Sequence, residues 1–450
     1  MAEKSRSLSG ERRKSSGEKG GKSLEDVDTV VEEQFKEEDK ALTKYQWFHG
    51  LMPRGECEEI LKEEGDFLVR RTTLAKVPMY CLTVRHNGEV KHIPVQYQKG
   101  IWTLNKDSKA TLADLVALCM KEKRVIPPSN ATLINGVHRP EYIVLHENVI
   151  LKEKIGQGAF GEVCIGKLKT KTGELDVAVK RAKEGHTKKS QVVAFIREAK
   201  IMRRLDHPNI VRMYGVATQE EPIMIILELA ANGSLKGYYK KNENVTVETK
   251  LNFAVDACRG MCYLSLEQII HRDLAARNCL LGSNYEVKIS DFGLSVADKR
   301  ELRLNKLHKV PVRWLAPETI AQGVFTTKTD VWSFGVLLWE IFANCRSDPF
   351  PGETNQQAMI LIGSKTPPME PPQGSPPIIK TVMDLCFVKN PEQRSDFTNL
   401  LHVLSPNEAP PTVAPKTSAT DLRAKAKFSD TGFDEIRSSR NTETKASVKR

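Results

Sequence analysis

The 450-residue sequence lacks any apolar run long enough to cross a lipid bilayer, because Lys, Glu or Asp interrupts every candidate segment. It also lacks a recognisable signal peptide, and Ala2 stands where N-myristoylation requires glycine. The nine cysteines show no paired spacing typical of zinc sites. We therefore expect a soluble, cytoplasmic protein with free thiols, with recruitment to the inner face of the plasma membrane as an option.

No nucleic-acid-binding motif accompanies the net charge of +11, so nucleic acid is not an expected partner. Phosphorylated peptides and anionic membrane surfaces are better candidates for a basic protein of this kind. No internal repeat is present, which excludes solenoids and propellers. The length exceeds what one hydrophobic core usually organises, so we expect at least two folded units.

Composition divides the chain into segments. Residues 1–42 and 405–450 are rich in charged or small residues and poor in large apolar ones, which predicts two disordered ends, the second of them basic. Apolar periodicity fills the interval between them except across 135–148, where glycine and proline indicate a linker. The expected folded units are therefore 47–134 and 149–404.

The first unit alternates between helix and strand patterns. It opens with Trp-Phe-His-Gly at 47–50, and Phe-Leu-Val-Arg at 67–70 indicates a strand. The other expected elements are helices at 54–64 and 111–121 and strands at 79–86 and 89–97. This order predicts a small α+β sandwich.

One strand of this sandwich carries Arg70. An arginine in a strand is more often a surface residue, but Arg54, Arg71, Thr72 and His92 lie on segments that could converge with it around a dianion. The unit resembles an SH2 domain. The resemblance implies that Arg70 contacts phosphotyrosine, that Arg54 and His92 flank it, and that the loop after Arg71, beginning with Thr72, closes over the phosphate. Because Arg71 and Thr72 replace the acidic residue and serine common in the family, we expect an unusually positive site.

The second unit opens with Gly156, Gly158 and Gly161, which would let backbone approach phosphates closely. Ordinary hairpins and dinucleotide-binding folds share this spacing, but in the latter the glycines lead into a helix, and here another strand follows. The next strand along the chain ends at Lys180. An ammonium group at the end of an apolar strand needs a partner, because burying an unpaired charge is costly. Glu198, on the following helix, can supply one.

The motif His-Arg-Asp-Leu-Ala-Ala-Arg-Asn at 271–278 is the strongest single signal. It places the carboxylate of Asp273 to accept a proton from an attacking hydroxyl and the amide of Asn278 to hold a metal ion. Asp291, in Asp-Phe-Gly, offers a second metal ligand, and Ala-Pro-Glu ends the intervening loop at 318. Residues 149–404 thus resemble a protein kinase domain.

This resemblance implies a β-rich small lobe and a helical large lobe, with ATP and Mg²⁺ (or Mn²⁺) between them. Asp330 and the pair Glu318–Arg394 are expected to be scaffold. The remaining residues expected at the nucleotide are Ile155, Val163, Ala178 and Leu280 around adenine, Leu227 as gatekeeper, and the hinge backbone from Glu228 to Ala230.

Two positions favour tyrosine as the acceptor. Ala275 occupies the position where serine/threonine kinases usually carry lysine, and Arg277 matches the tyrosine-kinase pattern. The order of an SH2 domain and then a kinase domain resembles the Fes/Fer group of non-receptor tyrosine kinases, without that group's membrane-binding front half. We expect phosphotyrosine-containing proteins and protein tyrosine substrates as partners. A pseudokinase adaptor and a serine/threonine or dual-specificity kinase remain as alternatives.

The loop from Asp291 to Pro317 contains no tyrosine, and Leu302 stands where the family's activating tyrosine would align. We hypothesise that SH2 engagement, with the domain packed on the small lobe and the Glu198 helix held inward, sets activity instead. The loop is basic and could favour acidic substrates or anionic surfaces; its cations are Lys299, Arg300, Arg303, Lys306 and Lys309.

Overall fold

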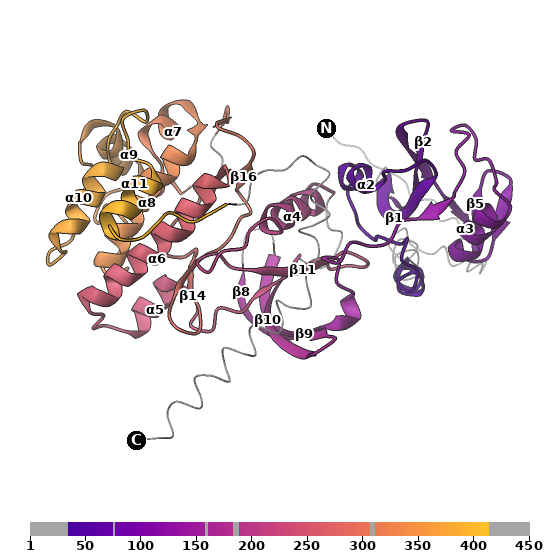
Figure 1. Cartoon of the computed structure of the whole chain (residues 1–450), viewed down its shortest axis with the longest axis horizontal. Coiled ribbons are helices and arrows are strands. Elements are labelled where there is room, and N and C mark those ends of the chain that lie inside the picture. Colours follow the sequence, from indigo (N-terminus) through magenta and orange to yellow (C-terminus); the bar gives the residue numbers. More distant parts are fainter. Residues whose placement is uncertain (1–34, 75–76, 158–160, 183–188, 307–310, 414–450) are drawn as a thin grey trace, which may run out of the picture.

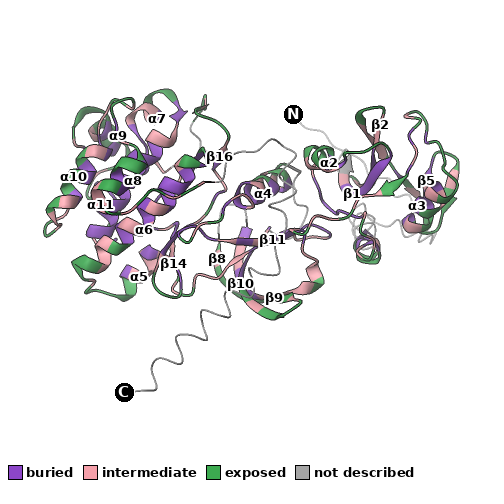
Figure 2. Ribbon diagram, in the orientation of Figure 1, coloured by how far each residue is buried: buried purple, intermediate pink, exposed green. Residues whose placement is uncertain are grey.

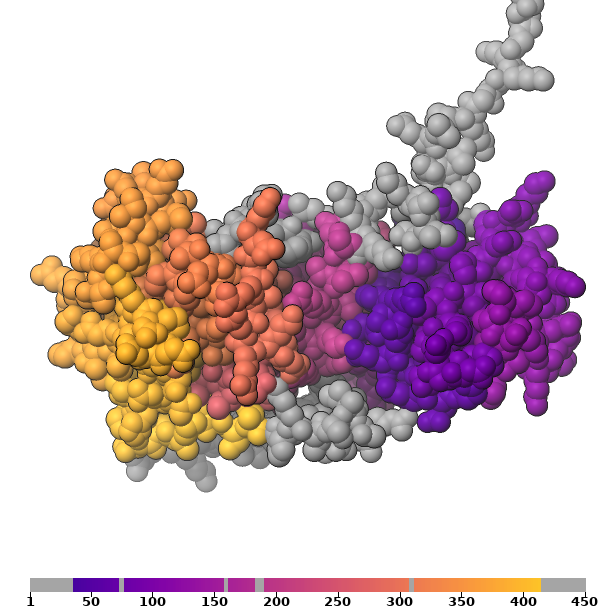
Figure 3. All heavy atoms as spheres, turned by 90° about the horizontal axis from the view of Figure 1, so that it is seen from above, coloured from indigo at the N-terminus to yellow at the C-terminus, as the bar shows by residue number. Residues whose placement is uncertain are grey.

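Three bodies lie in a row in the computed structural model, which describes residues 35–74, 77–157, 161–182, 189–306 and 311–413. The unit nearest the N-terminus occupies one end, a small β-rich lobe the middle, and a helical lobe the other end (Figure 1). A view from above gives the same order (Figure 3). None of the helices in these ranges is both long and apolar enough to cross a membrane.

The first unit is the predicted α+β sandwich. Its main sheet has the order β3-β2-β1-β7, and a second sheet has the order β4-β5-β6. The strands are β1 (Asp66–Leu74), β2 (Val77–His86), β3 (Glu89–Pro94), β4 (Gln96–Gln98), β5 (Ile101–Leu104), β6 (Asp107–Lys109) and β7 (Asn135–Gly136), and the helices are α2 (Arg54–Ile60) and α3 (Leu112–Lys121). The first helix ends at Ile60, short of the expected 64, whereas the second begins after the N-cap Thr111 as expected.

A further helix, at 35–42, corrects the prediction of disorder up to residue 42. Phe35 and Leu42, one heptad apart, are buried in the core of the first unit. The Phe35 ring lies 5.2 Å from that of Tyr80 and 5.8 Å from that of Trp102. These two apolar residues lie within a charged segment. The average composition of residues 1–42 therefore did not indicate the helix. Residues 1–34 of the predicted arm lie outside the described ranges.

The predicted linker at 135–148 forms hydrogen bonds with both of the bodies that it connects. Its β7 pairs in parallel with β1. Arg139 donates from its guanidinium to the carbonyls of Thr43, Tyr45 and Phe48 at 2.8–2.9 Å. Farther along, the backbone N–H of Val144 donates to the carbonyl of Val216 in the small lobe at 3.0 Å. The segment therefore joins the two bodies through hydrogen bonds.

The small lobe is a five-stranded antiparallel sheet of order β11-β12-β10-β9-β8 with one helix. The register sets Lys180 opposite Val163 on one side and Ile225 on the other. The elements are β8 (Val149–Gln157), β9 (Gly161–Thr170), β10 (Gly173–Ala182), β11 (Met213–Ala217), β12 (Met224–Glu228) and helix α4 (Lys189–Met202).

The large lobe is built around α8 (Thr327–Phe342), which is buried along nearly its whole length (Figure 2). A helix that is apolar on every side must lie inside a bundle. Around it lie α5 (Leu235–Lys241), α6 (Val247–Leu266), α7 (Pro317–Gln322), α9 (Asn355–Ser364), α10 (Pro377–Cys386) and α11 (Phe397–Leu404). Short strand pairs shape its loops: β13 (Ile269–Ile270) with β16 (Val296–Ala297), β14 (Cys279–Leu281) with β15 (Val287–Ile289), and β17 (Leu302–Arg303) with β18 (Val324–Phe325).

Part of the predicted disordered tail also packs on this lobe, which corrects its expected start at 405. Glu408 accepts two hydrogen bonds from the guanidinium of Arg259, at 2.6 and 2.8 Å. Val413 packs against the core. The predicted scaffold pair is present as well, because Arg394 donates to both carboxylate oxygens of Glu318 at 2.7 and 3.0 Å. Residues 414–450 lie outside the described ranges.

Candidate functional site

A cleft of about 1520 Å³ lies between the two lobes. Every described residue that the sequence assigned to catalysis, nucleotide or metal lines it, whereas Gly158 lies outside the described residues. The lining residues are Ile155, Gly156, Gly161, Val163, Ala178, Lys180, Glu198, Leu227, Glu228, Ala230, Asp273, Arg277, Asn278, Leu280 and Asp291. Segments more than a hundred residues apart in sequence thus meet at one site.

Lys180 is the centre of an ion cluster in this cleft, in which Lys180 and Glu198 are buried and the side chain of Asp291 is 49% exposed. Its Nζ lies 2.7 and 2.9 Å from the carboxylate oxygens of Glu198 and 3.1 Å from Oδ1 of Asp291. Burial lowers the pKa of Lys180, but the two carboxylates outweigh this and leave the pKa above its ordinary value. Burial would raise the pKa of Asp291, and Lys180 instead holds it below its ordinary value. Burial raises the pKa of Glu198, and the charge of Lys180 opposes this effect. Helix α4 is docked inward, because Glu198 lies on that helix and contacts Lys180.

Asp273 lies on the loop before β14 with both carboxylate oxygens engaged. Arg277 forms an ion pair with Oδ1, and the amide of Asn278 donates to Oδ2 at 2.8 Å and to the Asp273 carbonyl at 2.7 Å. The Arg277 guanidinium also lies 4.6 Å from the centre of the Trp314 ring. Both amide hydrogens of Asn278 are thus used, which leaves its carbonyl oxygen as the atom that can bind a metal ion.

Two buried carboxylates of α8 bind the loop that carries Asp273 through hydrogen bonds. Asp330 accepts the backbone N–H groups of His271 and Arg272 at 2.7 and 2.9 Å, and burial raises its pKa to about 6. Glu340 accepts the N–H of Ala276 and the indole N–H of Trp314, both at 2.9 Å. The sequence predicted a scaffold role for Asp330 but missed Glu340. A carboxylate within the apolar run of α8 was the available signal.

The Glu228 side chain, in the expected hinge, is engaged with neighbouring residues. Its carboxylate lies 3.1 Å from Nζ of Lys288 and accepts the N–H of Arg212 at 3.1 Å. The Glu228 N–H in turn donates to the Arg212 carbonyl at 2.8 Å. The carboxylate and the N–H of Glu228 are therefore both engaged within the protein, while Glu228, Leu229 and Ala230 line the cleft.

The first unit carries a second polar site around Arg70. Arg70 is 7% exposed, and its Nη1 lies 3.5 Å from the Met52 carbonyl. Its Nε is buried with no hydrogen-bond partner among the described residues. A buried guanidinium nitrogen without a hydrogen-bond partner costs free energy, so it indicates a site where a ligand could supply the acceptor.

Arg54 and His92 meet beside this site through one carboxylate. Glu58 accepts from Nε of Arg54 at 2.9 Å and lies 3.2 Å from Nε2 of His92. Burial lowers the pKa of His92, and the charges of Arg54 and Arg70 act in the same direction. The expected loop after Arg71 is wrong at Thr72, because β1 continues to Leu74. Thr72 lies two positions after Arg70, on the same face of this strand. The predicted residues therefore gather, together with an acidic residue that the sequence did not indicate.

Arg71 does not join this site, which corrects the expectation of an unusually positive pocket. Alternation along β1 turns its side chain to the opposite face, where it is 5% exposed and pairs with the buried Asp39 of the 35–42 helix. Asp39 also accepts the hydroxyl of Tyr80 at 2.6 Å. The charge of Arg71 is thus neutralised inside the core.

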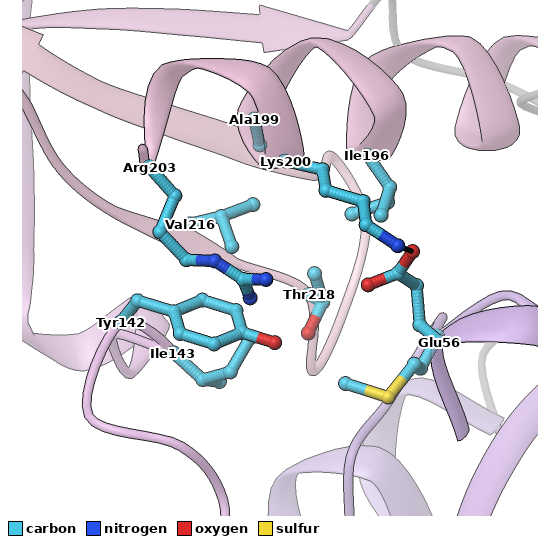
Figure 4. A pocket seen from close by; sticks show the side chains of 10 residues that line it. Glu56, Tyr142, Ile143, Ile196, Ala199, Lys200, Arg203, Val216 and Thr218 are labelled. Atoms are coloured by element: carbon cyan, nitrogen blue, oxygen red, sulfur yellow. Dashed lines mark hydrogen bonds and ion pairs between the residues drawn. The ribbon is translucent and has the colours of Figure 1, made fainter. Parts of the chain in front are cut away.

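Helix α2 touches α4 of the small lobe on the side away from the nucleotide cleft. Lys200 of α4 lies 3.0 Å from Glu56 of α2 (Figure 4). It also lies 2.5 Å from Glu59 of the same helix. Arg203, one turn further on, lies 4.3 Å from the ring of Tyr142. A small apolar cavity separates these polar contacts (Figure 4). The ion pairs hold α4 two residues from Glu198.

Backbone contacts reinforce this interface. The N–H of Leu51 donates to the carbonyl of Thr218 at 2.7 Å, and the Thr218 hydroxyl donates to the carbonyl of His49 at 3.1 Å. Gly50 has a φ of +62°, and a Cβ there would lie 2.0 Å from the Thr218 carbonyl oxygen. Only glycine permits this approach.

Comparison with known proteins agrees with the geometry. Residues 149–404 match the family described as protein tyrosine and serine/threonine kinase, and residues 47–118 match the SH2 domain. Tyrosine-protein kinase Fer of Homo sapiens is 38% identical over 385 residues, which cover 85% of this chain and 45% of the relative. Fer-related kinase 1 of Caenorhabditis elegans is 38% identical over 365 residues, 79% of this chain and 92% of the relative. The transforming protein Fps of Fujinami sarcoma virus is 36% identical over 363 residues, 80% and 41%. The chain spans less than half of the human and viral relatives and nearly all of the nematode one.

Proposed function

Because the chain belongs to the protein tyrosine and serine/threonine kinase family and carries an SH2 domain ahead of its kinase domain, we propose that it transfers the γ-phosphate of ATP to tyrosines of proteins. The observation that carries this proposal is the meeting of the Lys180–Glu198–Asp291 cluster with Asp273 in one cleft. Departures at these positions would favour the pseudokinase alternative, and none is present.

Each group has a defined task in this proposal. Lys180 contacts the α- and β-phosphates, and Glu198 keeps its ammonium in place. Asn278 and Asp291 would hold Mg²⁺ or Mn²⁺, which would supply positive charge beside the transferred phosphate. Asp273 accepts the proton of the attacking hydroxyl, while Arg277 and Asn278 fix the orientation of its carboxylate.

The preference for tyrosine is supported by the surroundings of Arg277. Ala275 is fully buried and presents no charge to the phosphate. Arg277 bridges the catalytic carboxylate and the Trp314 ring. Phosphoamino-acid analysis of the products separates tyrosine from serine or threonine as the acceptor.

The SH2 domain is proposed to bind phosphotyrosine through Arg70, Arg54, Thr72 and His92. The unpaired Nε of Arg70 supports this role. We further propose that the domain activates the kinase by holding α4 inward, because its α2 contacts Lys200 near Glu198. Phosphopeptide binding and catalysis would then be coupled through two adjacent helices.

The proposed setting is the cytoplasm, where ATP and phosphotyrosine-containing proteins occur. The exposed cations of the loop, Lys299, Arg300, Arg303 and Lys306, support a preference for acidic substrate segments. They could also contact an anionic membrane, which co-sedimentation with phosphatidylserine vesicles tests.

Replacing the proposed base tests the function directly. Asp273→Asn in the full chain should lower kcat by about 10²–10⁴-fold, because the carboxamide cannot accept the proton. Asp176→Asn, on the exposed part of β10, is the matched control and should be fully active. Phosphopeptide binding should be unchanged in both. Equal transfer by wild type and Asp273→Asn would overturn the assignment, and no transfer by wild type would favour the adaptor alternative.

A further inference from the structure

The segment from Phe292 to Ala316 contains one hydroxyl side chain, Ser295, and no threonine or tyrosine. Ser295 is 3% exposed, and its hydroxyl donates to the His271 carbonyl at 3.1 Å. Kinase activation loops are commonly ordered by a phosphate that pairs with arginine. Because this segment offers no accessible acceptor, something other than a phosphate must hold it.

An apolar cluster, here named the clamp, occupies the middle of the segment. Its members are Leu302, Leu304 and Leu315 of the segment with Ile270, Ile320 and Phe325 of the large lobe. Leu302 faces Phe325 in the β17–β18 pair, and the N–H of Leu304 donates to the Gly323 carbonyl at 2.9 Å. These two leucines are half-buried, whereas their neighbours Glu301, Arg303 and Asn305 are exposed. Every second side chain of this stretch therefore packs against the large lobe, and the ones between them face solvent.

Close backbone approach shows how tightly the clamp is built. Gly323 has a φ of +68°, and a Cβ there would lie 2.0 Å from the Leu304 carbonyl oxygen. Any other residue would push the segment away from β18. The glycine therefore permits the strand pair on which the clamp depends.

The clamp also engages the arginine next to the proposed catalytic base. The guanidinium of Arg272 lies 4.3 Å from the centre of the Phe325 ring, and its Nη1 donates to the Leu294 carbonyl at 2.8 Å. A desolvated cation above an aromatic face is held firmly. Phe325 therefore contacts Leu302 and Arg272 together, and it links the segment to the loop of Asp273.

We propose that the clamp and the Arg272–Phe325 contact hold the activation segment in its substrate-accepting conformation without any phosphate. This proposal rests on the proposed kinase function. Leu302, Leu304 and Phe325 are positioning residues, since they act through the segment and through Arg272 and touch neither nucleotide nor phenol.

The test uses the full chain after treatment with a tyrosine phosphatase, with poly(Glu,Tyr) as substrate. Wild type should keep its activity. Leu302→Ala combined with Leu304→Ala should lower kcat/KM for poly(Glu,Tyr) by about tenfold, while KM for ATP and phosphopeptide binding stay unchanged. Leu302→Met should be active because it restores the apolar contact. Leu266→Ala, at an exposed leucine of α6, is the matched control.

A second variant isolates the ring. Phe325→Leu keeps an apolar side chain but removes the aromatic face, so kcat should fall by about two- to fivefold. Hydrogen exchange at 296–306 should become faster in the double leucine variant. A large loss of wild-type activity on phosphatase treatment, or full activity with unchanged exchange in the double variant, would overturn the clamp. Absence of transfer by wild type would instead refute the kinase function, and the exchange measurement would still decide on the clamp.

Discussion

The contact between α2 and α4 gives the sharpest prediction about control. Lys200→Ala removes the ammonium that lies 3.0 Å from Glu56 and 2.5 Å from Glu59. Burial lowers the pKa of Lys200, but hydrogen bonds to Glu59 and Glu56 outweigh it and raise the pKa overall. The lysine is thus a cation between two carboxylates of another domain, and its loss should free α4.

The size of the effect follows from exposure. The side chains of Lys200 and Glu59 are 37% and 56% exposed, so that pair is screened and contributes little, whereas Glu56 is only 16% exposed. Exposed pairs are worth about 0.2–1 kcal/mol, and we expect about 1–2 kcal/mol for both pairs together. This corresponds to a factor of about 5–30 in the equilibrium between docked and undocked α4. If docking limits catalysis, kcat should fall by a factor within that range.

The assay compares kcat of wild type and Lys200→Ala and follows hydrogen exchange in α4. Lys380→Ala is a matched control, because Lys380 also bridges two carboxylates, Glu370 and Asp384, but within one lobe. Exchanging the charges, with Lys200→Glu and Glu56→Lys in one chain, should recover part of the activity. Unchanged kcat and unchanged exchange in Lys200→Ala would refute the coupling.

Three further predictions concern the SH2 domain. Asp39→Ala leaves Arg71 buried without its carboxylate, so urea unfolding should show a loss of about 3–5 kcal/mol, whereas Asp39→Leu with Arg71→Met should recover most of it; equal single and double losses would contradict this reasoning. Glu58→Gln removes the carboxylate held by Arg54, so phosphopeptide affinity measured by fluorescence anisotropy should rise about three- to tenfold, and an unchanged Kd would show that Glu58 does not compete. Burial lowers the pKa of His49 to about 4 from an ordinary value of about 6.5, so the unfolded chain binds a proton that the folded chain refuses between these values. The stability that His49 contributes should be fully present above pH 6.5 and fall by about 3 kcal/mol toward pH 4. His49→Gln should therefore differ from wild type by that amount in the change of stability between pH 6.5 and pH 4; a profile equal to that of wild type would count against it.

The cleft was predictable because its residues sit in short motifs of fixed spacing. The position of Lys180 at the end of an apolar strand demanded a partner, and Glu198 lies 2.7 Å away. The spacing of Asp273 and Asn278 placed both on one loop. Local sequence carries such information because the chemistry requires each residue type at one place in its motif.

Contacts between distant segments were not predictable in this way. The 35–42 helix depends on Phe35 and Leu42, whose burial is decided by a core far along the chain. Arg71 was placed at the phosphate because it follows Arg70, yet strand alternation sends it to the opposite face, to Asp39. The family resemblance predicted that the SH2 domain packs on the small lobe, but nothing near Lys200 in the sequence indicates that α2 supplies the contact. Such pairs arise from tertiary packing, which a local pattern does not encode.

Three supports fix the proposed catalytic geometry, and they differ in how easily they change. Asp330 and Glu340, 1% and 2% exposed, hold the catalytic loop through backbone hydrogen bonds that solvent cannot reach. The clamp holds the activation segment through apolar contacts and has no phosphate to gain or lose. Of these three supports, the contact of Lys200 with α2 is the one that joins two domains. It does so through partly exposed charges, which salt and ligands can weaken. Because the first two supports do not change, regulation is expected to act on the third. Helix α2 also carries Arg54 and Glu58 of the proposed phosphotyrosine site. Occupancy of that site is therefore the signal best placed to move α4.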